Sequence, residues 1–120
     1  KVYLNGTLET INWTGAVPAN LLQNMGAGRA YSIGSATGDH RAFNGLIDEV
    51  AVWYGTTLTS ENASTIYNGG VPTDLLSFDV TPSFLYYKFN EGSGTTAIDA
   101  TGNGNDGTIN GATYSTSVPG

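Results

Sequence analysis

The sequence predicts an all-β domain of antiparallel strands with one short helix. Its 120 residues include 17 glycines and are rich in Thr, Asn and Ser, residue types that favour tight turns and pleated strands. Strong helix formers are scarce, with two Lys, two Arg, four Glu and one Met in the chain. Short apolar stretches alternate with clusters of Gly, Asn and Pro, which is typical of strands joined by turns. The length matches one ordinary domain.

The charge and the absence of cysteine exclude several classes of partner and of site. The net charge is −6 and only four residues are basic, so we expect neither nucleic acid nor an anionic membrane as a partner. No apolar run approaches the roughly 20 residues that span a bilayer. Cysteine is absent, which removes disulfides and thiolate sites. The chain begins at Lys1 without a signal-peptide pattern, so we expect a piece of a longer or processed polypeptide.

The front of the chain predicts four strands, two of them in a hairpin. Residues 1–10 form a hairpin around Asn5-Gly6, a strong type I′ turn signal. Residues 12–28 are loop-like, 31–34 predict a short strand, and 35–42 a polar loop. A long strand is expected over 46–54, with the face that carries Val50 and Val52 turned toward the core.

The rear of the chain begins with the expected helix. Thr59 or Ser60 is its N-cap, Glu61 lies in its first turn, and Asn68-Gly69-Gly70 ends it. After a linker-like passage, short strands are expected over four ranges separated by turns: 84–89, 95–99, 108–109 and 112–114.

Two passages resemble the laminin G-like (concanavalin A-like) jelly-roll family. Residues 43–54, "FNGLIDEVAVWY", with 58–61 and 66–70, are similar to its closing signature, and residues 1–6 are similar to the hairpin before it. Residues 87–99, "YKFNEGSGTTAID", and 102–109, "GNGNDGTI", are similar to its opening signature. The resemblance implies an antiparallel jelly-roll β-sandwich.

The two signatures stand in reversed order. We expect residues 1–76 to be the C-terminal part of one jelly roll, 77–84 a linker, and 85–120 an opening motif or capping segment with a tail. Excision from a tandem array, a permuted domain and a terminal cap each explain this order. The strands are fewer than a full jelly roll needs, and unpaired edges are templates for another chain. We therefore expect an incomplete sandwich that belongs to a larger chain or an oligomeric assembly.

A polar cluster near the end offers a calcium site. Asp99, Asn103, Asn105 and Asp106 alternate with glycines, and Ca²⁺ takes oxygen ligands from carboxylates, amides and carbonyls. The alternative is a pair of Asx-Gly turns that hydrogen-bond their own backbone. The spacing lacks the regular ligands of an EF-hand. Ca²⁺ is the only cofactor that the sequence suggests.

Ligand-binding candidates lie in the front loops. Trp13 could stack on a sugar ring, and Asp39, His40 and Arg41 lie together in one polar loop, where binding residues concentrate. The alternative is a solvated loop. No catalytic residues are identified, because Asp48 and Glu49 are neighbours in a predicted strand and point to opposite faces.

These observations predict a non-enzymatic module. The resemblance implies adhesion, carbohydrate binding or a structural role on a virion, as a phage appendage or capsid decoration, or on a cell surface. Its partners would be glycans or neighbouring structural chains, and its location extracellular. The alternative is the accessory carbohydrate-binding part of a secreted polysaccharide-degrading enzyme.

Overall fold

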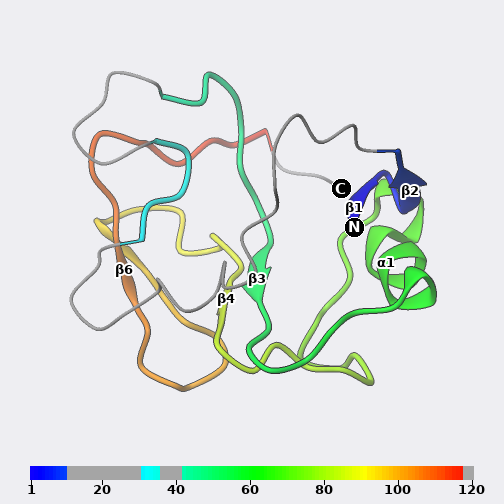
Figure 1. Cartoon of the computed structure of the whole chain (residues 1–120). Helices are drawn as coiled ribbons and strands as arrows, with labels where there is room; N and C mark the ends of the chain where they lie inside the picture. The colour runs from blue at the N-terminus through cyan, green and yellow to red at the C-terminus, as the bar shows by residue number, and fades with distance from the viewer. Residues whose placement is uncertain (11–30, 36–41, 118–120) are drawn as a thin grey trace, which may run out of the picture. The chain divides into compact units, whose positions relative to one another are not determined.

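A computed structural model describes residues 1–10, 31–35 and 42–117. The contacts divide the chain into two compact units, Lys1–Glu9 with Leu46–Gly120 and Thr10–Gly45. The described residues are β-rich, with three two-stranded antiparallel sheets and one short α-helix (Figure 1). This confirms the predicted β-rich class with a single short helix.

The predicted N-terminal hairpin is confirmed. Strand β1 (Val2–Leu4) pairs with β2 (Thr7–Glu9), and Leu4 stands opposite Thr7. The turn residues Asn5 and Gly6 both have positive φ, 50° and 74°, as a type I′ turn requires.

Helix α1 (Ser60–Tyr67) starts and stops where its capping residues predict. The Thr59 hydroxyl accepts from the Asn62 N–H at 3.1 Å, and the Asn62 side chain accepts from the Thr59 N–H at 2.9 Å, which is a reciprocal capping box. Asn68 ends the helix in the left-handed conformation, with φ 44°. A short 3₁₀ turn, η1 (Asn68–Gly70), follows.

The central pairing joins distant segments. Strand β3 (Val50–Val52) pairs antiparallel with β4 (Leu85–Tyr87), and Ala51 stands opposite Tyr86. The prediction of one strand over 46–54 was wrong, because Glu49 adopts φ +52° and ends the extended backbone. Phe89 has φ +52° as well, so β4 also stops before the predicted end at 89.

The third sheet pairs β5 (Thr96–Ala97) with β6 (Gly107–Thr108). It connects to β4 through a bridge between Tyr87 and Asp99 and a 2.9 Å bond from the Ala100 N–H to the Tyr86 carbonyl. The strands predicted at 31–34 and 112–114 were wrong: the first gives only a Ser35–Ala42 bridge, and the second is irregular.

The core lies on β4 rather than on β3. Leu85, Tyr86 and Tyr87 are all buried, and Tyr86 is fully inaccessible. The strand face that carries Val50 and Val52 was predicted to point toward the core, but Val52 is 37% exposed. On one face of β4, buried apolar side chains pack against partly buried ones; the cluster consists of Leu85, Tyr87 and Ala97 with Phe84, Phe89 and Ile109. Tyr86 points to the other face, where its hydroxyl joins a polar network. The other buried apolar residues among those described are Leu75 and Pro82.

Candidate functional site

The buried carboxylate of Asp99 organises the turn that follows β5. It is 5% exposed, and its Oδ1 accepts from the Tyr86 N–H at 3.1 Å, the Thr101 N–H at 3.1 Å and the Thr101 hydroxyl at 2.7 Å. Its Oδ2 accepts from the Asn105 N–H at 3.1 Å. Burial alone would raise the pKa of Asp99, but these hydrogen bonds outweigh it and hold the pKa below its ordinary value.

The other three predicted cation ligands join the same turn. Asp106 Oδ1 accepts from the Asp99 N–H at 2.8 Å. The Asn103 amide donates to the Ser83 and Phe84 carbonyls at 3.1 and 3.2 Å, and the Asn105 amide donates to the Phe84 carbonyl at 2.8 Å. The structure therefore brings all four residues together against the start of β4. The bonds of the Asn103 and Asn105 amides reach the backbone of Ser83 and Phe84, outside the turn itself.

The chemistry left for a cation at this turn is limited. Both Asp99 oxygens already accept N–H donors, and each N–H would repel a metal placed on the same lone pair. The oxygens without a hydrogen bond to another described residue are Oδ2 of Asp106 and Oδ1 of Asn103 and Asn105. In the described ranges, no three His, Cys, Asp or Glu side chains converge to hold a metal ion.

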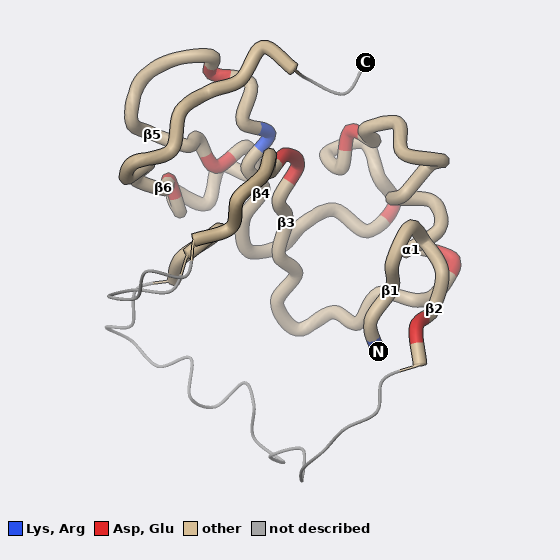
Figure 2. The backbone as a smooth tube through the Cα atoms, turned by 90° about the horizontal axis from the view of Figure 1, so that it is seen from above, with Lys and Arg blue, Asp and Glu red and all other residues tan. Residues whose placement is uncertain are grey.

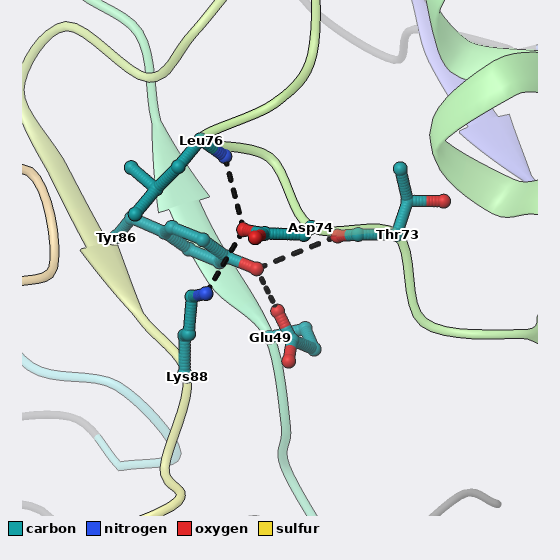
Figure 3. A network of polar contacts seen from close by, with 6 residues as sticks. All are labelled: Glu49, Thr73, Asp74, Leu76, Tyr86 and Lys88. Carbon is teal, nitrogen blue, oxygen red and sulfur yellow. Dashed lines mark hydrogen bonds and ion pairs between the residues drawn. The ribbon is translucent and has the colours of Figure 1, made fainter.

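A second polar network surrounds the Tyr86 hydroxyl (Figure 3). The hydroxyl donates to Glu49 Oε2 and lies 3.4 Å from the Thr73 carbonyl. Burial raises the pKa of Tyr86 far above its ordinary value, and the hydrogen bond to the Glu49 carboxylate adds to this. Glu49, whose left-handed backbone bounds β3 at its N-terminal end, is thus also the residue whose carboxylate accepts the hydrogen bond from Tyr86, the central residue of β4.

An ion pair flanks the same tyrosine. Lys88 Nζ lies 2.9 Å from Asp74 Oδ1 and 5.4 Å from the centre of the Tyr86 ring. The hydrogen bond from Lys88, with one from the Leu76 N–H, lowers the pKa of Asp74. Because both side chains are partly exposed, at 29% and 53%, this pair positions Lys88 over the ring rather than adding much stability.

A third polar network surrounds the Glu91 carboxylate. Glu91 Oε1 accepts from the Ile98 N–H at 2.7 Å, and Oε2 accepts from the Tyr114 hydroxyl at 2.8 Å. Burial opposes ionisation of Glu91, yet the hydrogen bonds from Ile98 and Tyr114 leave its pKa below the ordinary value. The Glu-Gly turn is therefore a clamp that holds β5 and the segment after β6.

An open depression lies beside the start of α1. Its volume is about 600 Å³, and Glu61, Asp74 and Asp79 line it together with the half-buried ring of Phe78. The remaining lining groups are hydroxyls and one amide, from Asn62, Thr65, Thr73 and Ser77. The depression can offer hydrogen-bond acceptors around one aromatic surface. Figure 2 shows that the described Asp and Glu positions are spread along the backbone.

The predicted ligand-binding residues Trp13, Asp39, His40 and Arg41 lie outside the described residues. Asp48 is described, and its Oδ1 accepts from the Glu49 N–H at 3.1 Å.

Sequence reasoning missed the Tyr86 network, with Thr73, Asp74 and Lys88. One signal was available, because Lys88 is one of only four basic residues and lies in the aromatic stretch over 84–89 that predicts a strand.

Comparisons with known proteins leave the family open. No protein-family model, no curated protein and no solved structure matches this chain. None of the described helices is long and apolar enough to cross a membrane.

Proposed function

We propose that this chain is a non-catalytic structural or adhesive module of an extracellular assembly, on a virion or a cell surface. In this proposal its β-rich fold is part of a jelly-roll sandwich that strands from a neighbouring polypeptide complete. The observation that carries the proposal is the mismatch between a small core and a large exposed apolar surface.

Six apolar residues are buried among those described, and all but Leu75 and Pro82 lie on β4 and β5. Large apolar side chains remain exposed on and beside the strands. On the hairpin these are Val2, Leu4 and Leu8, and around β3 they are Leu46, Ile47, Val52 and Tyr54. Scattered apolar exposure is normal, but an apolar run along strand edges is typical of a surface that a partner covers.

The sheets themselves support the same proposal. Each described sheet has two strands, and each strand has two or three residues. Such sheets are marginal alone and gain stability when further strands are added. Within the described ranges β3 has β4 as its one strand partner, so its outer edge can accept another strand in the manner of β-augmentation.

The buried carboxylate of Asp99 and two half-buried carboxylates favour a structural role over catalysis. Asp99, Glu49 and Glu91 are each engaged by backbone or tyrosine donors. These contacts hold the strands in place, so all three carboxylates already serve as hydrogen-bond acceptors within the fold.

The experiment compares association of the full chain with that of two variants by sedimentation velocity over a range of concentrations. Val52→Lys places a charge on the edge of β3, which blocks strand addition. Val71→Lys is the matched control, because Val71 is 52% exposed and lies outside the strands. We expect association that Val52→Lys weakens and Val71→Lys leaves unchanged. A chain that stays monomeric at all concentrations contradicts the proposal.

The second candidate is a carbohydrate-binding module, alone or as the accessory part of a polysaccharide-degrading enzyme. The depression with its carboxylates, hydroxyls and the Phe78 ring favours it, because sugar hydroxyls pair with carboxylates and sugar faces stack on aromatic rings. A glycan array with and without a chelator tests this candidate and any role of Ca²⁺ together. Binding that Asp79→Asn abolishes supports it, and an array without any bound glycan contradicts it.

A further inference from the structure

The chain contains five Asn-Gly pairs, and the structure describes all of them: Asn5-Gly6, Asn44-Gly45, Asn68-Gly69, Asn103-Gly104 and Asn110-Gly111. Asn before Gly is chemically labile, because glycine has no Cβ to hinder its backbone nitrogen from attacking the asparagine side chain. The attack needs two freedoms. The side-chain amide must be able to turn toward the following nitrogen, and the glycine must have open space.

Two of the asparagines lack the first freedom. The Asn103 amide donates to two carbonyls, those of Ser83 and Phe84, and is thereby held against β4. The Asn68 amide donates to the Val71 carbonyl at 3.4 Å, a weaker restraint. At both positions a hydrogen bond must break before the side chain can turn.

Two other pairs lack the second freedom. A Cβ on Gly6 would lie 3.1 Å from Tyr67 Cβ, and a Cβ on Gly45 would lie 2.7 Å from an edge carbon of the Phe43 ring. Side chains therefore cover both glycines. Asn5 is further restrained by the strand pairing of Leu4 with Thr7 on either side of the turn.

Asn110-Gly111 has both freedoms. Asn110 is exposed, and its side chain has no hydrogen bond to another described residue. Among the described residues, and apart from Gly111 and its two chain neighbours, no atom lies within 4 Å of the position that a Cβ on Gly111 would occupy. Gly111 has φ +77°. The turn is tethered on both sides, by the 2.8 Å bond from the Ile109 N–H to the Thr95 carbonyl and by the Tyr114 hydroxyl.

We propose that Asn110 is a site of spontaneous deamidation in the folded protein. The Gly111 nitrogen attacks Cγ of Asn110, a new C–N bond closes a succinimide ring, and the side-chain nitrogen leaves as ammonia with the proton from the Gly111 amide. One water then opens the ring at either carbonyl, which gives aspartate or isoaspartate. The balance is one amide and one water converted to one carboxylate and one ammonium, without a redox step.

The product changes the chain in two ways. It adds one negative charge to a chain whose net charge is already −6. The isoaspartate form also lengthens the backbone by one methylene between Ile109 and Tyr114, the two residues that tether this turn. We therefore expect the isoaspartate product to weaken the hydrogen bond between Tyr114 and Glu91.

The test incubates the full chain at neutral pH and physiological temperature, and follows all five sites by peptide mapping and mass spectrometry. A parallel sample is held in guanidinium chloride. In the folded chain we expect Asn110 to convert first, with Asn103 slower by on the order of tenfold because two hydrogen bonds restrain it. In denaturant the five rates should converge, since each asparagine then precedes an unhindered glycine.

Asn110→Gln is the control variant, and it should lose the first product while the other four sites keep their rates. The proposal is overturned by a folded chain in which another site converts first. Equal rate orders in the folded and denatured samples, or no conversion in the folded chain, overturn it as well.

Discussion

Replacing Asp99 by Asn tests whether this carboxylate holds the rear strands together. The substitution keeps the shape of the side chain but turns one acceptor oxygen into an NH₂ donor. In the unsubstituted chain, three backbone N–H groups donate hydrogen bonds to Asp99, those of Tyr86, Thr101 and Asn105. At least one of them loses its acceptor, and the remaining bonds lose the assistance of the charge.

The expected loss follows from these bonds. A hydrogen bond to a charged group contributes about 1.5–3 kcal/mol, and a buried donor left unsatisfied costs about 1–3 kcal/mol. Losing one acceptor and weakening the others should lower the free energy of unfolding by about 3 kcal/mol. For a chain of this size the Tm should fall by roughly 10 °C.

The assay is urea unfolding of the full chain followed by circular dichroism, with Asp79→Asn as the matched control. Asp79 is exposed and its side chain has no hydrogen bond to another described residue, so its change should stay within about 0.5 kcal/mol. Equal unfolding midpoints for the two variants would refute the reasoning, because the turn would then stand without the carboxylate.

Three further predictions concern the same networks. The pKa values of Asp99 and Glu91 are both lowered in the folded chain, so the stability that these groups contribute is present above the ordinary carboxyl pKa and is lost as the pH falls through the folded values. Acid titration of the free energy of unfolding should show this loss from about pH 5 downward. Asp99→Asn should make the free energy of unfolding depend less on pH in this range. The pKa values of Tyr86, Tyr87 and Tyr114 are raised, that of Tyr86 most strongly, so stability should fall as the pH rises above the ordinary tyrosine pKa of about 10. Ultraviolet titration should show tyrosines that resist ionisation until the fold opens, and their number should fall by one in Tyr86→Phe. Because N–H donors occupy the Asp99 oxygens, we expect Ca²⁺ or a chelator to shift the Tm by less than the Asp99→Asn change; a larger shift would assign the turn to the cation.

Local signals made parts of the fold predictable. The hairpin at Asn5-Gly6 and both ends of α1 depend on residues within a few positions of one another, and the structure has them as predicted. The grouping of Asp99, Asn103, Asn105 and Asp106 was also predictable, because glycines bring nearby polar side chains together in a turn.

The remaining features depend on contacts that a local pattern does not contain. The strand over 46–54 was too long because Glu49 leaves the extended region, where its carboxylate meets Tyr86 from a segment 37 positions away. The core was expected on the Val50 and Val52 face, yet it is β4 that is covered on both faces. The alternation of β3 alone does not show which neighbour covers it.

The pairing of β3 with β4 has a consequence for biosynthesis. A ribosome delivers Val50–Val52 well before Leu85–Tyr87, so the apolar strand must wait in an unpaired state while the intervening residues are made. Asp48 and Glu49 directly precede β3, and charged residues beside an apolar strand oppose aggregation of nascent chains. We therefore expect Asp48→Asn, which keeps an acceptor for the Glu49 N–H, to reduce the soluble yield of freshly translated chain, and the reduction should grow when translation is slowed between β3 and β4.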